Sequence, residues 1–289
     1  MSSLLIFGYG YTARFFVQAV GGDFKKIFGT SRKPKGKTDP HVTLLRFDGV
    51  DADPVLHQAV SEATAVLVSV PPDERGDPVL DAFSDLLAAN KNLRWLGYLS
   101  TVGVYGDHQG EWVDEHAPLH PQNERSRRRV EAEQAWLDLG QDAGLPVHIF
   151  RLAGIYGPGQ NALVNISNGT ARRILKEGQV FNRIHVADIA TVLCASLQNP
   201  HPEAIYNVTD DEPAPPQDVI VYAAQKMGVP LPPLYPFEKA ELSPMARSFY
   251  AENKRVSNRL IRQELGVRLA YPTYREGIDA LHAAGEGQS

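Results

Sequence analysis

Short apolar runs alternate along the first half of the chain with longer segments in which apolar residues recur at helical spacing. The runs predict strands at Ser3–Phe7, Lys26–Gly29, Val42–Phe47, Ala65–Val70, Arg94–Leu99 and Val147–Arg151. They are rich in Val, Ile, Leu and Phe and show little alternation, which suits parallel strands covered on both faces. The segments between them predict helices at Thr12–Val20, Pro54–Ala63, Pro78–Asn90 and Ser126–Leu139. This repeated succession predicts an α/β fold with a doubly wound parallel sheet.

After Arg151 the pattern changes. A loop rich in Gly and Pro precedes a predicted helix at Ala162–Glu177, a second helix at Val186–Gln198 and a strand at Ala204–Val208 that returns to the sheet. The Pro-rich stretches Pro213–Pro216 and Pro230–Pro236 indicate a smaller, partly helical unit. We therefore predict a first domain over residues 1–153, to which residues 180–209 return, and a smaller domain interleaved with it over residues 154–289.

Charge and composition exclude several classes of protein. The formal net charge of −5 is mild and mixed, which argues against a nucleic-acid or membrane-surface binder. The single cysteine, Cys194, excludes an intrachain disulfide and a Cys-rich metal site. No run reaches the roughly 18 apolar residues of a membrane span. The apolar run before Gly8 lacks the charged leader of a signal peptide, so we expect a cytoplasmic chain.

The residues after the first strand, Gly8 to Ala13, fit the pattern G-x-G-x-x-A. In this pattern the first glycine turns the chain, the second lets a pyrophosphate approach the backbone, and a small third residue packs the helix on the strand. Tyr11 and Thr12 open the helix, whose N-terminus presents free N–H groups to phosphates. The sequence therefore predicts a Rossmann-type dinucleotide-binding domain.

The end of the second strand bears on which dinucleotide is bound. An acidic residue there would bind the ribose of NAD, but this chain has Ser31, Arg32 and Lys33. A cation beside a hydroxyl suits a 2′-phosphate, which favours NADP over NAD. The alternative is a solvated basic loop from Arg32 to Lys37.

Two further strand ends predict cofactor contacts at the same edge of the sheet. Asp48 follows the third strand, where its carboxylate would meet the adenine edge. Val70 and Pro71 close the fourth strand at the carboxyl rim, where a dinucleotide lies in this type of sheet.

Four motifs occur in order: Gly8–Ala13, Leu99–Gly106, Arg151–Gly159 and Arg183–Ala190. Together they resemble the extended short-chain dehydrogenase/reductase superfamily, in its NAD-dependent epimerase/dehydratase group, although the glycine loop is one residue shorter than usual. The resemblance covers nearly the whole chain and is specific for the fold rather than for the reaction. It implies a dinucleotide cofactor, a small polar substrate, and cofactor contacts at Ala153 and Ile155.

In that superfamily a Ser or Thr after the fifth strand acts with a Tyr and with a Lys four residues later. Thr101 matches the hydroxyl, but the Tyr and Lys positions fall on Arg125 and Arg129. Arginine stays protonated, so Arg125 cannot be a general base. It could polarise a carbonyl or clamp an anionic group, while Arg129 could replace the lysine's hydrogen bonds to the nicotinamide ribose.

Other residues could supply a proton, but each also has a structural interpretation, which we favour. Tyr105 and Tyr156 would wedge loops against the core, while His185 and Asp188 would hold a loop and cap a helix. Cys194 lies among apolar residues of a predicted helix, where a buried inert thiol is expected.

Two functions follow from these observations. The first is an NADP-dependent oxidoreductase or epimerase-like enzyme that uses Thr101, Arg125 and Arg129. The second is a non-catalytic regulatory protein that senses NADP(H) and has lost the proton donor. The superfamily often dimerises through the helix at Ser126–Leu139, and its apolar positions permit a homodimer here: Val130, Trp136, Leu137 and Leu139.

Overall fold

Seven parallel strands form one twisted sheet in the computed structural model, which describes residues 2–34 and 39–288. The sheet consists of β1 (Ser3–Phe7), β2 (Lys26–Ser31), β3 (Val42–Arg46), β4 (Ala65–Val68), β5 (Trp95–Thr101), β7 (Val147–Leu152) and β11 (Ile205–Val208). Their spatial order is β11-β7-β5-β4-β1-β2-β3, so the order of the chain reverses between β1 and β4. In open α/β sheets a ligand binds at the carboxyl ends of the strands beside such a reversal.

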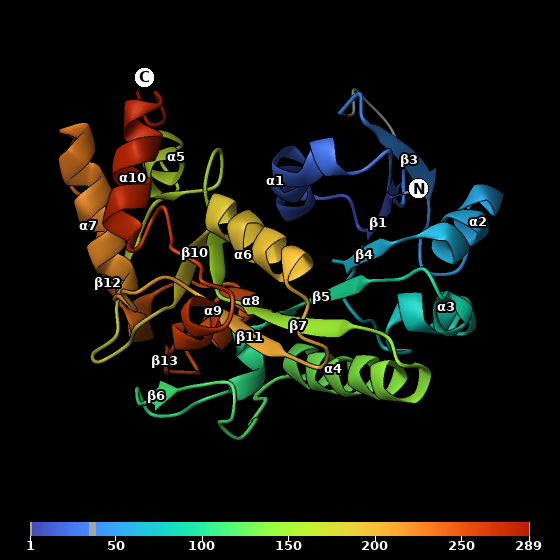
Figure 1. The fold of residues 1–289 in the computed structure, drawn as a ribbon. Coiled ribbons are helices and arrows are strands. Elements are labelled where there is room, and N and C mark those ends of the chain that lie inside the picture. The colour runs from blue at the N-terminus through green and yellow to red at the C-terminus, as the bar shows by residue number, and fades with distance from the viewer. Residues whose placement is uncertain (1, 35–38, 289) are drawn as a thin grey trace.

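Helices cover both faces of this sheet (Figure 1). On one face lie α1 (Tyr11–Val20) and α6 (Val186–Gln198), and on the other lie α2 (Pro54–Glu62), α3 (Pro78–Ala89) and α4 (Glu124–Ala143). The first face buries Phe16 and Trp95 in one apolar core, and the second buries Tyr98 and Trp136 in another. The predicted doubly wound parallel sheet is therefore confirmed.

Local sequence explains where several of these helices begin and end. Asp53 and Asp77 cap α2 and α3 by accepting backbone N–H groups, and each is followed by a proline, which suits the first helical position. Asn123 caps α4 in the same way. Gly144 ends α4 in the left-handed conformation, which costs glycine little.

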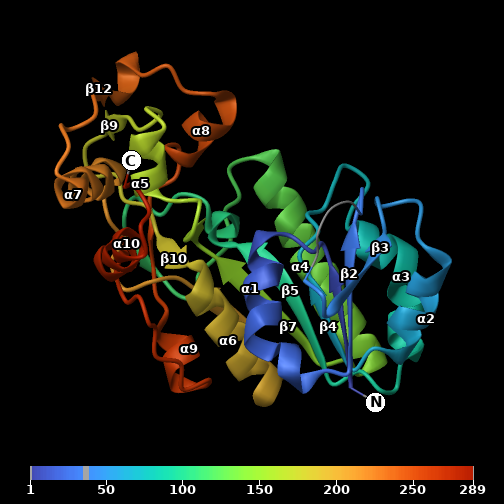
Figure 2. The ribbon, with the colours of Figure 1, turned by 90° about the horizontal axis from the view of Figure 1, so that it is seen from above.

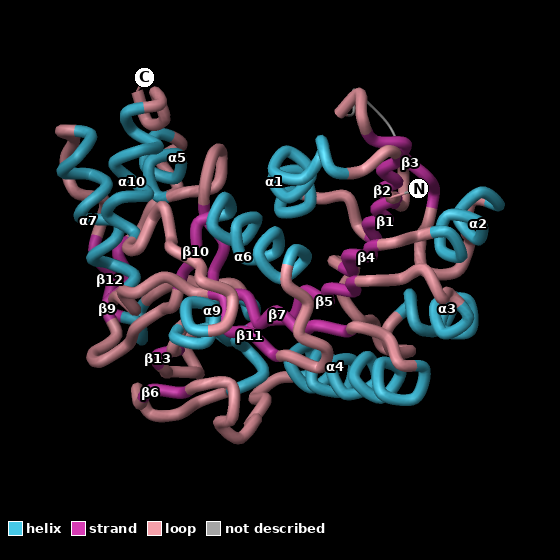
Figure 3. Tube along the Cα trace, in the orientation of Figure 1, coloured by secondary structure: helices cyan, strands magenta, loops and turns pink. Residues whose placement is uncertain are grey.

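A second unit packs beside the carboxyl ends of the strands (Figure 2). Its helices are α5 (Ala162–Ser167), α7 (Pro216–Met227), α8 (Pro244–Phe249), α9 (Arg259–Gln263) and α10 (Tyr274–Ala283). Its short strands pair β8 (Gly154–Tyr156) with β10 (Arg183–His185), β9 (Arg173–Leu175) with β12 (Leu234–Pro236), and β6 (Trp112–Val113) with β13 (Arg255–Val256). Figure 3 shows that loops connect most of these elements.

The predicted helix at Ala162–Glu177 is wrong. The helix ends at Ser167, and the chain then forms β9, which pairs with β12. Gly169 has φ +68°, a left-handed backbone that breaks the helix and turns the chain. The other predicted helices and strands lie within a few residues of those observed. Among the described residues, no helix is long and apolar enough to cross a membrane.

Candidate functional site

The glycine loop lies between β1 and α1, at the reversal of strand order. Gly8 has φ +87°, and a Cβ placed on it would lie 3.2 Å from Val70 Cγ2. The N–H of Gly8 donates to Thr30 Oγ1 at 2.9 Å, which ties the loop to β2. A side chain at Gly8 would therefore be strained and crowded, so this close turn depends on glycine.

The start of α1 is open to a ligand. Gly10 is the N-cap residue and no side chain caps the helix, so its first N–H groups are not satisfied in that way. Thr12 is buried, and Ala13 is buried in the core against the sheet. This is the arrangement that the G-x-G-x-x-A pattern predicts for holding a pyrophosphate. Contact with a cofactor stays a prediction.

Tyr11 bridges the glycine loop to the loop at residues 157–160. Its hydroxyl donates to the carbonyl oxygen of Pro158 at 2.9 Å, and burial raises the pKa of Tyr11 to about 12. From the other side, Glu286 Oε1 accepts the N–H of Gly159 at 2.7 Å. The loop is therefore held between α1 and the segment after α10.

Ser31, Arg32 and Lys33 lie at the carboxyl end of β2, on the same rim as the glycine loop. Arg32 and Lys33 are exposed, and neither side chain forms an ion pair within residues 2–34 and 39–288. Ser31 Oγ accepts the N–H of Lys33 at 3.3 Å. Lys35 and Lys37, which belong to the alternative of a solvated basic loop, lie outside the described residues.

Asp48 follows β3, where its side chain holds a turn. One carboxylate oxygen accepts the N–H groups of Val50 and Asp51, and the other accepts Arg46 at 2.7 Å. The hydrogen bond from Arg46 lowers the pKa of Asp48 to about 2, so the carboxylate is ionised. The turn explains this residue without a ligand, and a contact with adenine stays a prediction.

The remaining predicted cofactor contacts lie at strand ends. Val70 and Pro71 follow β4, and Val70 packs where a Gly8 side chain would be. Ala153 follows β7 and is buried, whereas Ile155 in β8 has 38% of its surface exposed. Ile155 therefore presents an apolar side chain to whatever occupies the rim.

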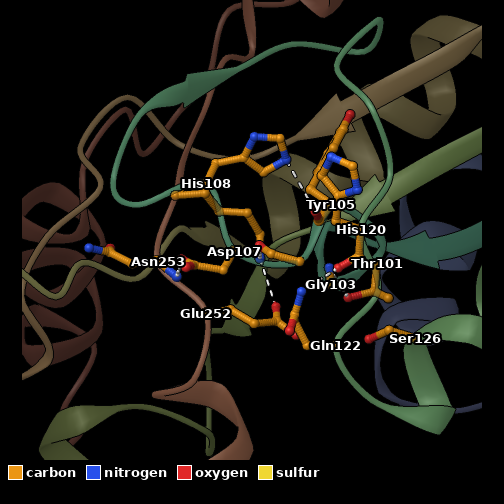
Figure 4. A network of polar contacts seen from close by, with 12 residues as sticks. Thr101, Gly103, Tyr105, Asp107, His108, His120, Gln122, Ser126, Glu252 and Asn253 are labelled. Atoms are coloured by element: carbon orange, nitrogen blue, oxygen red, sulfur yellow. Dashed lines mark hydrogen bonds and ion pairs between the residues drawn. The ribbon is translucent and has the colours of Figure 1, made fainter.

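Two hydroxyl groups lie together at the carboxyl end of β5 (Figure 4). Thr101 Oγ1 accepts the N–H of Gly103 at 3.1 Å. A Cβ on Gly103 would lie 3.1 Å from Ser126 Oγ and 3.4 Å from Thr101 Oγ1. Sequence reasoning missed Ser126; the available signal was its place in the first turn of α4, next to Arg125.

The two arginines aligned with the superfamily's Tyr and Lys differ in their surroundings. Arg125 is exposed, but Arg129 is buried and donates to the Tyr98 hydroxyl at 2.9 Å and to the Leu99 carbonyl oxygen at 2.8 Å. These contacts hold α4 against β5. They are structural contacts, and a catalytic role for Arg129 stays a prediction.

A buried ion pair lies beneath the same strand ends. The Arg151 guanidinium binds the Glu133 carboxylate, with a shortest distance of 2.8 Å, and also donates to the Tyr105 hydroxyl at 2.9 Å. That hydroxyl donates to Asn207 Oδ1 at 2.7 Å, and burial raises the pKa of Tyr105 to about 12. Tyr105 is therefore a structural residue, as the favoured interpretation predicts.

His185 and Asp188 hold the start of α6. His185 Nδ1 accepts the N–H of Ala187 at 3.2 Å, and burial lowers the pKa of His185 to about 4. The buried carboxylate of Asp188 accepts the N–H groups of Ala270 and Tyr271 at 2.7 and 3.0 Å. The expected roles in helix capping and loop fixation are confirmed.

Tyr156 and Cys194 carry groups that burial holds in their neutral forms. The Tyr156 hydroxyl donates to the Thr273 carbonyl oxygen at 3.4 Å, and burial raises its pKa. Burial likewise raises the pKa of the half-buried Cys194 thiol to about 11, so it is a poor nucleophile at neutral pH.

Contacts of Glu252, which is labelled in Figure 4, tie the second unit to the start of α4. Lys254 Nζ donates to the Gly106 carbonyl oxygen and to Glu252 Oε2, each at 2.7 Å. Asn123, the N-cap of α4, donates to Glu252 Oε1 at 3.3 Å. Because these groups are largely buried, they fix the second unit against the strand ends that carry Thr101.

Comparisons with known proteins agree with this geometry. The model of the NAD dependent epimerase/dehydratase family matches residues 37–209. Protein YeeZ of Escherichia coli K12 is 26% identical over an alignment of 225 positions, which covers 72% of this chain and 77% of YeeZ. The structure of a functionally unknown conserved protein from Silicibacter pomeroyi is 51% identical with a TM-score of 0.89, covering 99% of this chain and 100% of that one. The dTDP-glucose 4,6-dehydratase of Bacillus anthracis, solved with NAD, is 16% identical with a TM-score of 0.79, covers 100% of this chain and 98% of its own, and shares the fold.

Proposed function

Because the chain belongs to the NAD dependent epimerase/dehydratase family, we propose that it is an NADP-dependent oxidoreductase or epimerase-like enzyme acting on a small polar substrate. The observation that carries the proposal is the turn at Gly8, whose φ of +87° and contact with Val70 leave room for no side chain. This turn directs the uncapped start of α1 toward the rim where a pyrophosphate would bind.

The preference for NADP rests on the end of β2. Arg32 is exposed, stands beside the Ser31 hydroxyl, and makes no ion pair with any described residue. A guanidinium with free donors can bind a phosphate in a bidentate manner, which a carboxylate at this position would oppose. The expected cofactor is therefore NADP(H).

The dinucleotide, when bound, supplies the hydride chemistry, and this chain's residues orient the reacting oxygen of the substrate. The partly exposed hydroxyl of Thr101 can donate a hydrogen bond to that oxygen, and the buried hydroxyl of Ser126 lies beside it across Gly103. Arg125 is exposed in the first turn of α4 and can polarise a carbonyl, but it cannot accept a proton. Buried Arg129 keeps α4 in place for both.

A second candidate function is a regulatory protein that senses NADP(H) without turnover. It is favoured by the protonation states at the rim, because burial raises the pKa values of Tyr105 and Tyr156 and neither arginine can act as a base. A cytoplasmic location is proposed for either function. A homodimer is proposed too, although Trp136, one residue on which it depended, is buried in the core of its own chain.

Calorimetric titration with NADPH, NADH and their oxidised forms tests the proposal. We expect NADPH to bind at least about tenfold more tightly than NADH, and Arg32→Ala to remove that preference. Arg94→Ala, which changes an exposed arginine at the amino end of β5, should leave it intact. Equal affinities for NADPH and NADH would exclude the role of Arg32, and no binding of any dinucleotide would overturn the proposed function.

Substitution of the glycine loop tests the same site independently. Gly8→Ala should lower NADPH affinity at least about tenfold, because the new Cβ crowds Val70 and disfavours φ +87°. Gly22→Ala is the matched control, since a Cβ there meets nothing within 4 Å. Steady-state hydride transfer with any carbonyl or alcohol substrate then separates the enzyme from the sensor.

A further inference from the structure

A cavity of about 520 Å³ opens in the second unit where β8, α5, α7 and α10 meet. This volume is in the range of sites that hold small organic ligands. Apolar side chains line much of it, including Ile155, Val219, Ile220 and Ile278. Its wall therefore favours a ligand with an apolar body.

The charged side chains of the cavity are both cations. Among the described residues that line it, only Arg172 and Arg183 carry charge, and no carboxylate lines it. Arg172 is exposed and makes no side-chain hydrogen bond within residues 2–34 and 39–288. Arg183 is half-buried, and one of its nitrogens donates to the carbonyl oxygens of Phe181 and Ala214, at 2.9 and 3.1 Å. Its remaining donors have no partner among the described residues.

Asp210 is the carboxyl group that acts most strongly on Arg183, but the two side chains form no ion pair within residues 2–34 and 39–288. Asp210 is buried; one of its oxygens accepts the N–H of Glu212 at 3.2 Å, while the other has no hydrogen-bond partner among the described residues. Burial raises the pKa of Asp210 to about 8, which favours the neutral form of its carboxyl group. A partly buried guanidinium without a counter-charge is costly, and an anionic ligand would supply that charge.

We propose that this cavity binds a small organic anion, with its carboxylate or phosphate group on Arg172 and Arg183 and its apolar body along Ile155 and Ile220. A guanidinium matches both head groups, because its donors form a planar fork. The assignment rests on the proposed function, since Ile155 is also a predicted cofactor contact.

Titration of the full chain, with and without saturating NADPH, tests the proposal. The probes are hexanoate, hexyl phosphate, inorganic phosphate and the neutral hexanamide. We expect hexanoate or hexyl phosphate to bind at least about tenfold more tightly than hexanamide, and the tighter of the two identifies the head group. Inorganic phosphate should bind more weakly than hexyl phosphate, because it lacks the apolar body. Hexanamide binding as tightly as both anions would overturn the proposal.

Variants locate the binding. Arg172→Gln should weaken binding of the preferred anion about tenfold, and it should leave the fold intact because its side chain is exposed. The control Arg94→Gln should leave the affinity for the anion unchanged. Arg183→Lys keeps the charge but loses the planar fork of donors, so it should weaken binding of the preferred anion several-fold. Unchanged affinity in both cavity variants would place the anion elsewhere and refute the site.

The two proposals can fail separately in this experiment. If NADPH binds and neither organic anion does, the cavity assignment is wrong and the cofactor assignment stands. If an organic anion binds through Arg172 and no dinucleotide binds, the anion site is real and the proposed function is wrong.

Discussion

Two pairs of arginines lie in contrasting surroundings. Arg129 and Arg151, packed between α4 and the sheet, are buried and donate to groups of the protein itself. Arg172 and Arg183, in the second unit, face a cavity and retain donors without partners among the described residues. The residue type is the same, but only Arg172 and Arg183 line a cavity in which their free donors can reach a ligand.

This difference bears on Arg129, for which the sequence predicts a catalytic role that stays a prediction. The arginine-rich start of α4 resembles the catalytic helix of the superfamily, and this resemblance places Arg129 at the position of the catalytic lysine. The structure instead shows Arg129 bonded to β5. Arg129 is buried between α4 and β5, whereas Arg172 and Arg183 line a cavity, and spacing along the chain does not report this difference.

The largest effect expected from this comparison is on stability. Glu133→Ala removes the partner of buried Arg151 and should lower the free energy of unfolding by about 3–5 kcal/mol, as judged by urea denaturation. The exposed neighbour Glu131 provides a control, and Glu131→Ala should change the free energy of unfolding by less than about 0.5 kcal/mol. A loss below about 1 kcal/mol for Glu133→Ala would contradict a structural role for the pair.

A smaller effect is expected at Arg129. Arg129→Met removes hydrogen bonds to the Tyr98 hydroxyl and the Leu99 carbonyl oxygen, so stability should fall by about 2 kcal/mol while NADPH affinity changes less than about twofold. Arg127→Met, on the exposed face of the same helix, should cost about 0.5 kcal/mol or less. Loss of NADPH affinity without loss of stability would make Arg129 a cofactor residue instead.

The smallest effect concerns the pH dependence of anion binding. Asp210 is neutral below its pKa of about 8 and charged above it, so raising the pH from 6 to 9 creates a counter-charge for Arg183. Affinity for hexanoate, which carries one negative charge throughout this range, should fall about fivefold, measured by calorimetry. The other ionisable groups near Asp210 are Arg183, Asp211, Glu212 and Tyr156, and burial raises the pKa of Tyr156. Asp210→Asn should flatten the dependence; a wild-type affinity that rises with pH would contradict this account.

The sheet and most helices could be predicted because their signals are local. Runs such as Leu4–Phe7 are buried on both faces of a parallel sheet, and their composition shows it. The second unit was predicted only as partly helical, and its short strands were missed; β9, for example, pairs with β12, about sixty residues later in the chain. A short strand stabilised by so distant a segment leaves little trace in its own sequence.

The residues of the candidate site likewise differ in whether their signal is local in the sequence. The glycine loop could be predicted because its requirement for a positive φ falls on one residue, Gly8. Ser126 lies beside Thr101 only through the packing of α4 on β5. The cavity with Arg172 and Arg183 is assembled from four elements of the second unit, and its charge depends on the burial of Asp210.

The loop at residues 157–160 has a consequence for the rate at which a cofactor exchanges. Tyr11 holds this loop from the glycine-loop side, and Glu286 holds it from the segment after α10. A loop anchored on two sides opens only when one anchor is released, so we expect dinucleotide residence time to depend on residue 286 although that residue lies outside the cofactor site. Release would then be set by the fraying of a distant segment rather than by the strength of the phosphate contacts alone.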